Sequence, residues 1–299
     1  MVGTHFIPAV EHRDMIDETA GEIADMQTHS SSVVAVKAAR ALREITDREF
    51  PTVDEYRRTL ERNSKALRRA NPSHASLHNT QQRIVDHIAD LAVETVEDAQ
   101  SETLAIIDEI IEEIEAGKRK AAEMAADQLR DGETILTHDY STTVLSTLTR
   151  AVEDGKEFTV YVTEARPRYI GRKMARRLAE FEAIETKLIV DSACGHVLSE
   201  VDRVLFGMTC IVDGTLYNRV GTYPIAATAA DSDVPADVVG SSAKLVDSGF
   251  AFQNEERVAS EVMREPAEGF EIENPAYDAT PTRLLDKIIT DEGVDDPAR

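Results

Sequence analysis

The sequence lacks the features that mark several large classes of protein. No apolar run approaches the ~20 residues that span a lipid bilayer, and the first residues do not have the layout of a signal peptide. There are only two cysteines, Cys194 and Cys210, and they fit no zinc or redox spacing. We therefore expect a cytoplasmic protein in a reducing compartment, with no membrane as its partner.

The usual motifs of nucleotide and hydrolase chemistry are also missing. There is no P-loop, no nucleophile elbow and no glycine fingerprint, so we expect no cofactor and disfavour a nucleotide-dependent oxidoreductase. Cys194 and His196 could supply a nucleophile and a base, but a cysteine after a buried strand is more often a small packed residue. His74 and His78 have metal-ligand spacing without a third ligand nearby, so we expect no metal.

Positive charge is scarce, and lysine is scarcer than arginine. The net charge is −23, and only 9 of the 33 basic residues are lysines. A surface of this kind is typical of a high-salt cytoplasm, where charge repulsion is screened within roughly 3 Å, although ordinary solubility charge is the alternative. In either case the charge argues against a general surface for DNA or anionic membranes. A phosphate site would have to be a local basic pocket.

The sequence does contain a clear change of pattern near Gly132. Before it, the spacing of apolar residues predicts helices, and the longest helix carries one apolar stripe of Leu104, Ile107, Ile111 and Ile114. After it, short apolar runs alternate with helical stretches, which predicts an α/β fold with a parallel, doubly wound sheet.

We therefore expect a helical N-terminal domain over residues 1–130 and a Rossmann-like α/β domain over residues 131–299. A final helix is expected over Pro281–Thr290. The predicted strands are Thr134–Thr137, Phe158–Val162, Lys187–Val190, Arg203–Phe206, Cys210–Val212 and Val238–Val239.

Polar residues follow each of these strands. The carboxyl ends of parallel strands meet at one sheet edge, so six polar clusters should lie together there. Two clusters open helices with hydroxyl groups and free backbone N–H groups, which suits phosphate, and Arg166, Arg219 and Lys244 could neutralise it. The alternative is that Ser141 and Thr222 are ordinary N-caps and that Arg166 pairs with Glu164 or Asp191.

Several segments resemble one known family. They are Ile135-Leu136-Thr137-His138, Tyr161-Val162-Thr163-Glu164-Ala165-Arg166-Pro167, Val190-Asp191-Ser192-Ala193, Asn218-Arg219-Val220-Gly221-Thr222 and the C-terminal Glu273-Asn274-Pro275-Ala276-Tyr277-Asp278-Ala279-Thr280-Pro281. They are similar to the alpha, beta and delta subunits of translation initiation factor 2B, a family that also contains isomerases of ribose-1,5-bisphosphate and methylthioribose-1-phosphate. The likeness is greatest to its initiation-factor-type archaeal members. It implies the same two-part fold and a homo-oligomer, either a dimer or a hexamer.

The resemblance also implies which site residues are kept. Where the isomerases have a catalytic cysteine this sequence has Asp139, and where they have a catalytic aspartate it has Thr209. A phosphate-binding arginine is replaced by Asn71. The candidate ligand-binding residues are His29, Ser30, Ser31, Ser32, Ser141, Thr142, Thr143, Arg166, Asn218, Arg219 and Lys244.

With the catalytic pair replaced, we expect a non-catalytic regulatory subunit in translation initiation. It would bind a phosphorylated sugar or a nucleotide, and contact the alpha subunit of initiation factor 2. The alternative is a divergent sugar-phosphate isomerase that performs aldose–ketose isomerisation. In that case Asp139 would be the base, and Asp191 or Glu164 would be the acid.

Overall fold

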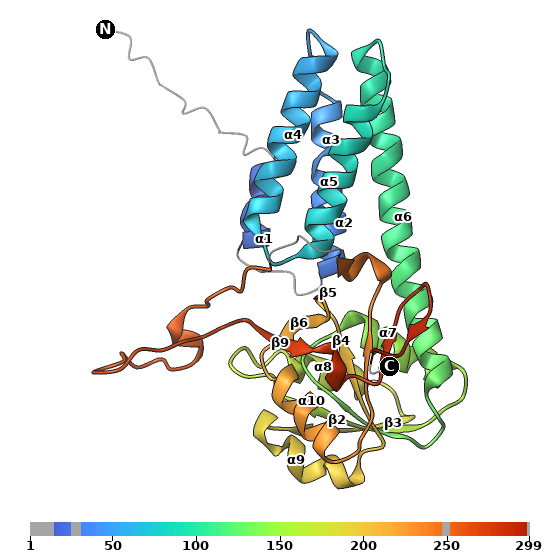
Figure 1. Ribbon diagram of the computed structural model, residues 1–299, viewed down its shortest axis with the longest axis vertical. Coiled ribbons are helices and arrows are strands. Elements are labelled where there is room, and N and C mark those ends of the chain that lie inside the picture. The colour runs from blue at the N-terminus through green and yellow to red at the C-terminus, as the bar shows by residue number, and fades with distance from the viewer. Residues whose placement is uncertain (1–14, 25–30, 247–251, 298–299) are drawn as a thin grey trace, which may run out of the picture.

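The computed structural model describes residues 15–24, 31–246 and 252–297, and it begins with a bundle of helices (Figure 1). The helices are α1 (Met15–Ala24), α2 (Ser31–Ala41), α3 (Arg43–Thr46), α4 (Val53–Ala70), α5 (Ala75–Asp90) and α6 (Val96–Gln128). Their apolar faces form one core. None of the helices in the described residues is both long and apolar enough to cross a bilayer.

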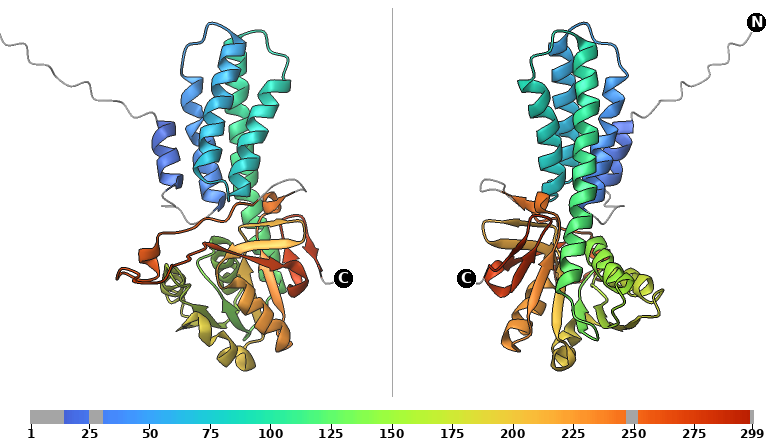
Figure 2. Two further views of the ribbon diagram at one scale, coloured as in Figure 1. Left: turned by 60° about the vertical axis from the view of Figure 1, so that its left-hand side comes forward. Right: turned by 90° about the vertical axis from the view of Figure 1, so that its right-hand side faces the viewer.

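The helix α6 links the two parts of the protein (Figure 2). Thr95 caps its start, because its side-chain oxygen accepts a hydrogen bond from the Asp98 backbone N–H at 3.1 Å. Its first half packs in the core of the bundle, and its second half packs on the α/β part through alanines such as Ala121 and Ala125. Leu104 was expected in the apolar stripe but is 37% exposed, because the buried face is centred on Ile107.

The α/β part contains a seven-stranded sheet with the order β11-β10-β7-β4-β1-β2-β3. All neighbouring pairs are parallel except β10 with β11. The strands are β1 (Thr134–Thr137), β2 (Phe158–Thr163), β3 (Ile184–Ile189), β4 (Arg203–Gly207), β7 (Ala236–Val239), β10 (Lys287–Ile289) and β11 (Val294–Asp295). The predicted α/β fold class is confirmed.

Helices cover both faces of this sheet, as the doubly wound prediction requires. Alternate residues of one strand enter different cores: Ile135 of β1 packs with α6, α7 (Thr142–Glu153) and α8 (Gly171–Leu178). Leu136 packs on the other face with α9 (Cys194–Val197) and α10 (Thr222–Asp231). The chain passes from helix to sheet between Gln128 and Thr134. The division into two domains at residue 130 stays a prediction.

A second, four-stranded sheet was not predicted. Its order is β8 (Leu245–Val246), β5 (Cys210–Val212), β6 (Thr215–Arg219) and β9 (Tyr277–Pro281). The predicted helix over Pro281–Thr290 is wrong. Residue 281 ends β9, a 3-10 turn follows, and the next apolar run forms β10 beside β7.

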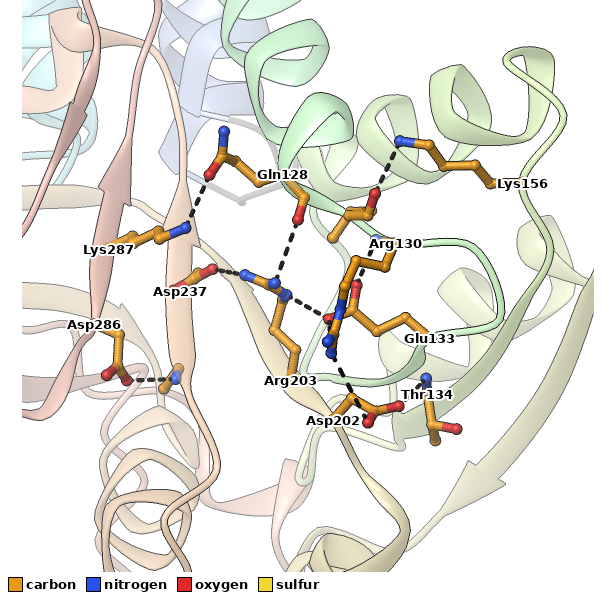
Figure 3. Close-up of polar contacts among 12 residues, drawn as sticks. Gln128, Arg130, Glu133, Thr134, Lys156, Asp202, Arg203, Asp237, Asp286 and Lys287 are labelled. Atoms are coloured by element: carbon orange, nitrogen blue, oxygen red, sulfur yellow. Dashed lines mark hydrogen bonds and ion pairs between the residues drawn. The ribbon is translucent and has the colours of Figure 1, made fainter.

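A buried ion network ties the amino ends of the strands together (Figure 3). Arg203, at the start of β4, donates from Nε to Glu133 at 3.0 Å and also forms an ion pair with Asp237. Its third nitrogen donates to the Gln128 carbonyl oxygen at 3.3 Å. Lys287 donates to the Gln128 side chain at 2.8 Å. The end of α6 and four strands of the sheet are therefore held at one point.

We predict that Arg203→Met lowers the free energy of unfolding by about 3–5 kcal/mol, because it leaves Glu133 and Asp237 as buried charges without their partner. Denaturant unfolding measures this loss. The matched control is Arg130→Gln, since Arg130 contacts the same Glu133 from an exposed position and should contribute less than about 1 kcal/mol. Equal small losses for both variants would contradict the prediction.

Candidate functional site

A cavity lies at the carboxyl ends of β1 and β4, beside the second sheet. It is lined by Ser31, His138, Asp139, Tyr140, Ser141, Thr142, Thr143, Gly207, Met208, Thr209, Asn218, Arg219 and Lys244. The structure therefore brings most of the predicted ligand-binding residues to one place.

Three of the other predicted residues lie elsewhere or are not described. His29 and Ser30 lie outside the described residues. Ser32 is buried on α2 and does not line this cavity, whereas its neighbour Ser31 does, with a buried hydroxyl that has no hydrogen-bond partner. Ligand binding by all of these residues stays a prediction.

The start of α7 forms one wall of the cavity. The Ser141 side chain accepts a hydrogen bond from the Val144 backbone N–H at 3.2 Å, so Ser141 is the N-cap, as the alternative interpretation held. Gly207 at the end of β4 lets the two segments approach, because a Cβ atom there would collide with the Ser141 side chain. The positive end of a twelve-residue helix therefore faces the cavity, a position that favours an anion.

His138 is structural rather than a free base. Its Nε2 lies 2.9 Å from the Val220 carbonyl oxygen and therefore donates to it. Its Nδ1 then accepts from the Thr163 hydroxyl at 2.6 Å. With both ring nitrogens in hydrogen-bond contact, His138 joins the ends of β1, β2 and β6.

Asp139 and Arg219 form a shielded ion pair in the cavity. Arg219 Nε lies 3.4 Å from Asp139 Oδ2, and each residue is only 8% exposed. The other carboxylate oxygen and the Nη1 atom of Arg219 are buried without a hydrogen-bond partner. Unpaired buried polar atoms cost free energy, so a polar ligand that contacts them would recover that cost.

Lys244 is the second basic residue of the cavity, beside Arg219. The side chain is buried, and Nζ donates to the Met208 carbonyl oxygen at 2.8 Å. Burial lowers the pKa of Lys244 to about 8, and the positive charge of Lys118 adds to this effect. Sequence reasoning found Lys244 as a phosphate ligand but could not show its burial, on which its acidity depends.

The two acids that the alternative proposed are used elsewhere. The carboxylate of Asp191 accepts hydrogen bonds from the backbone N–H groups of Ala165 and Arg166 at 2.8 and 2.6 Å. Glu164 pairs with Arg172 at 2.8 Å. Neither acid lines the cavity, so neither is placed to act with Asp139.

Arg166 does not occupy the position expected for it. Its guanidinium contacts the Tyr169 hydroxyl and donates to the Val262 carbonyl oxygen at 3.2 Å, so pairing with Glu164 or Asp191 is also wrong for this side chain. Residues 165 and 169 of this loop have positive φ angles, and Arg166 lines a neighbouring cavity that shares Asp139 and Arg219 with the first one.

His74 connects the helical bundle to the site through Tyr277. Its Nε2 lies 3.4 Å from the Tyr277 hydroxyl, and the Tyr277 ring lies 4.8 Å below the Arg219 guanidinium. Burial lowers the pKa of His74 to about 3, and the charges of Arg219 and Lys244 contribute. Sequence reasoning considered His74 only as a metal ligand, because its partner is 203 residues away.

We predict that His74 makes stability depend on pH between about 6.5 and 3. The unfolded chain binds a proton at His74 in this range and the folded chain does not, so the free energy of unfolding falls as the pH falls, by up to about 1.4 kcal/mol per pH unit. His74→Gln should show a shallower slope in denaturant unfolding. His196→Gln, which changes an exposed histidine on α9, should keep the wild-type slope. Parallel slopes for all three proteins would refute this assignment.

Comparison with known proteins gives a consistent set of relatives. The model of the Initiation factor 2 subunit family matches residues 27–297. Ribose 1,5-bisphosphate isomerase of Haloterrigena turkmenica is 34% identical, covering 92% of this chain and 88% of that protein. The protein of the same name from Haloferax volcanii is 32% identical, covering 93% and 88%. The crystal structure of translation initiation factor eIF-2B, subunit delta, from A. fulgidus has a TM-score of 0.74 at 27% identity, covering 94% of this chain and 88% of that chain.

These relatives correct the expectation of a non-catalytic regulatory subunit, which is wrong. Six curated archaeal relatives that are 30–34% identical over most of the chain are named ribose 1,5-bisphosphate isomerase. The expectation rested on Thr209, whose hydroxyl lies 3.5 Å from Asn218 and cannot serve as an acid. It overlooked that Lys244 brings a different titratable group to the same cavity.

Proposed function

This chain belongs to the Initiation factor 2 subunit family, and from this premise we propose that it is a sugar-phosphate isomerase of the ribose 1,5-bisphosphate type. The observation that carries the proposal is that Asp139 and Lys244 line one cavity with an anion-binding helix start. A carboxylate and a lysine with a lowered pKa supply the base and the acid that aldose–ketose isomerisation needs. A homo-oligomer remains part of this proposal.

One phosphate of the substrate is held at the start of α7. Thr142 and Thr143 line the cavity there, and the positive end of the helix dipole favours an anion at this place. Arg219 supplies a full positive charge, and its unpartnered Nη1 is a hydrogen-bond donor for a phosphate or hydroxyl oxygen. This placement leaves the sugar carbons beside Asp139.

The reaction then requires two proton transfers that return the enzyme to its starting state. Lys244 gives a proton to the ring oxygen as the bond from that oxygen to C1 breaks. Asp139 removes the proton from C2, and the electron pair of that C–H bond forms the C1–C2 double bond. Asp139 returns the proton to C1 while the C2 hydroxyl becomes a ketone and its proton goes back to Lys244.

We predict that Asp139→Asn lowers kcat for conversion of ribose 1,5-bisphosphate to ribulose 1,5-bisphosphate by a factor of about 10²–10⁴, because an amide cannot take up the proton. The turnover is measured in molar salt on the purified protein. Glu164→Gln is the matched control, since this carboxylate follows the neighbouring strand but lies outside the cavity, and it should keep the wild-type rate. If the wild-type protein turns over neither this sugar nor other pentose phosphates, the proposed function is overturned.

Lys244 gives the proposal a pH signature. The acid must be protonated, so kcat/KM should fall as the pH rises above about 8, where the ammonium loses its proton. Lys244→Arg keeps the positive charge but cannot release a proton near neutral pH, so it should lower kcat sharply and remove the fall above pH 8. A fully active Lys244→Arg variant would show that this side chain only binds phosphate.

A further inference from the structure

A second cavity adjoins the first and shares Asp139 and Arg219 with it. Its walls come from the loop after β2 and from the segment that precedes β9. Figure 1 shows that this segment, residues 252–276, projects from the α/β part. The lining residues are Asp139, Ala165, Arg166, Pro167, Arg168, Ile170, Arg219, Val220, Arg257, Glu261, Asn274, Pro275 and Ala276.

Arginines dominate the walls of this second cavity. Four line it, namely Arg166, Arg168, Arg219 and Arg257, against the two carboxylates Asp139 and Glu261. Four positive charges less two negative charges leave a formal charge of +2, on a chain whose net charge is −23. Glu255, which pairs with Arg257, reduces this local excess to +1 if it is counted. The cavity is a local concentration of positive charge of the kind that an acidic protein needs for an anion.

Three of these guanidinium groups are shielded and close together. The side chains of Arg168, Arg219 and Arg257 are only 19%, 10% and 14% exposed. Burial lowers the pKa of Arg168, and the positive charges of Arg257 and Arg219 lower it further. The protein therefore holds like charges together where water does little to screen them, which costs free energy.

Two carboxylates, Asp139 and Glu261, line the cavity together with these arginines. Glu261 is shared, because it contacts Arg257 at 2.7 Å and Arg168 at 3.7 Å. Nε of Arg219 lies 3.4 Å from the Asp139 carboxylate, and Nη1 of Arg219 is buried with no hydrogen-bond partner. An anion in the cavity would offset part of the formal positive charge of its walls and accept charge-assisted hydrogen bonds from these planar groups.

We propose that this arginine cavity binds the second phosphate of a bisphosphorylated sugar, with Arg168 as a phosphate ligand that also sets specificity. This inference rests on the proposed function, which places the first phosphate at the start of α7. The ion pair of Asp139 and Arg219 stands between the two cavities. The sugar carbons beside Asp139 then carry one phosphate into each cavity, and a monophosphate fills only one of them.

The test compares the binding of ribose 1,5-bisphosphate, ribose 1-phosphate and ribose 5-phosphate by titration calorimetry. It is made in the Asp139→Asn background, so that no turnover contributes heat. Arg168→Gln should weaken binding of the bisphosphate about 10- to 100-fold, the effect of losing a hydrogen bond to a charged group. For the monophosphate whose only phosphate lies at α7, the affinity of the Arg168→Gln variant should stay within about twofold of the affinity of the parent protein.

Two further variants make the result decisive. Arg168→Lys keeps the charge but not the planar fork, so it should restore part of the affinity for the bisphosphate. Arg58→Gln removes one exposed positive charge on α4 at a residue that lines neither cavity, and it should change none of the three affinities. An equal loss for all three sugars, or no loss for the bisphosphate, would overturn the inference.

The same measurements separate this inference from the proposed function. Suppose that Arg168→Gln selectively weakens binding of the bisphosphate but the wild-type protein shows no turnover. The proposed isomerase function would then be overturned, and the arginine cavity would stand as a phosphate site. Suppose instead that the wild-type protein shows turnover and that Arg168→Gln leaves the KM for ribose 1,5-bisphosphate unchanged. The assignment of the arginine cavity as a phosphate site would then be overturned, and the proposed isomerase function would stand.

Discussion

The ion pair between Arg219 and Asp139 is the interaction on which the site depends. Asp139 follows β1 of the large sheet, and Arg219 ends β6 of the small sheet, so the pair joins the two sheets across a cavity. Arg219 in turn rests on the Tyr277 ring from β9. Because both charges are shielded from water, moving either one would leave the other unpaired at a large cost. The pair therefore fixes the position of the Asp139 carboxylate in the cavity.

The remainder of the fold keeps that pair in place from two directions. At the opposite edge of the sheet, Arg203 holds the amino ends of β1, β4 and β7 together, which sets the register of the strands whose carboxyl ends form the cavity. From the helical bundle, His74 contacts Tyr277 beneath Arg219. A neutral histidine suits this place, because a third positive charge beside Arg219 and Lys244 would be repelled.

Much of this arrangement could be predicted from the sequence, because the carboxyl ends of parallel strands lie at one edge of a sheet. Continuous apolar runs after Gly132 predicted β1 and β2, and the rule that their carboxyl ends meet brought Ser141, Asn218 and Arg219 to one edge. The small sheet could not be predicted in the same way. The residues of β9 pair with β6, which lies about 60 positions earlier in the chain. The local spacing of apolar and polar residues does not indicate which distant strand will be the partner.

The burial of charged side chains was the other property that could not be predicted from the sequence, and it determines their pKa values. Lys244 can be recognised as a cation in a loop, but only its enclosure brings its pKa toward neutrality. Arg168 can be read as a surface charge after a proline, but the fold places it among two other guanidinium groups. Both properties arise from contacts between segments far apart in sequence, which residue type and spacing do not encode.

The net charge of −23 determines how these cavities can act on an anion. In dilute salt the field of the whole chain opposes a phosphorylated ligand at a distance, whereas at molar salt that field is screened within roughly 3 Å. Hydrogen bonds between guanidinium and phosphate have a length of about 2.8 Å, which is within that screening length. Molar salt therefore leaves these contacts in place in a shielded cavity. Recognition in such a protein has to rely on direct contact rather than on long-range attraction, and clustering its arginines around a cavity provides that contact.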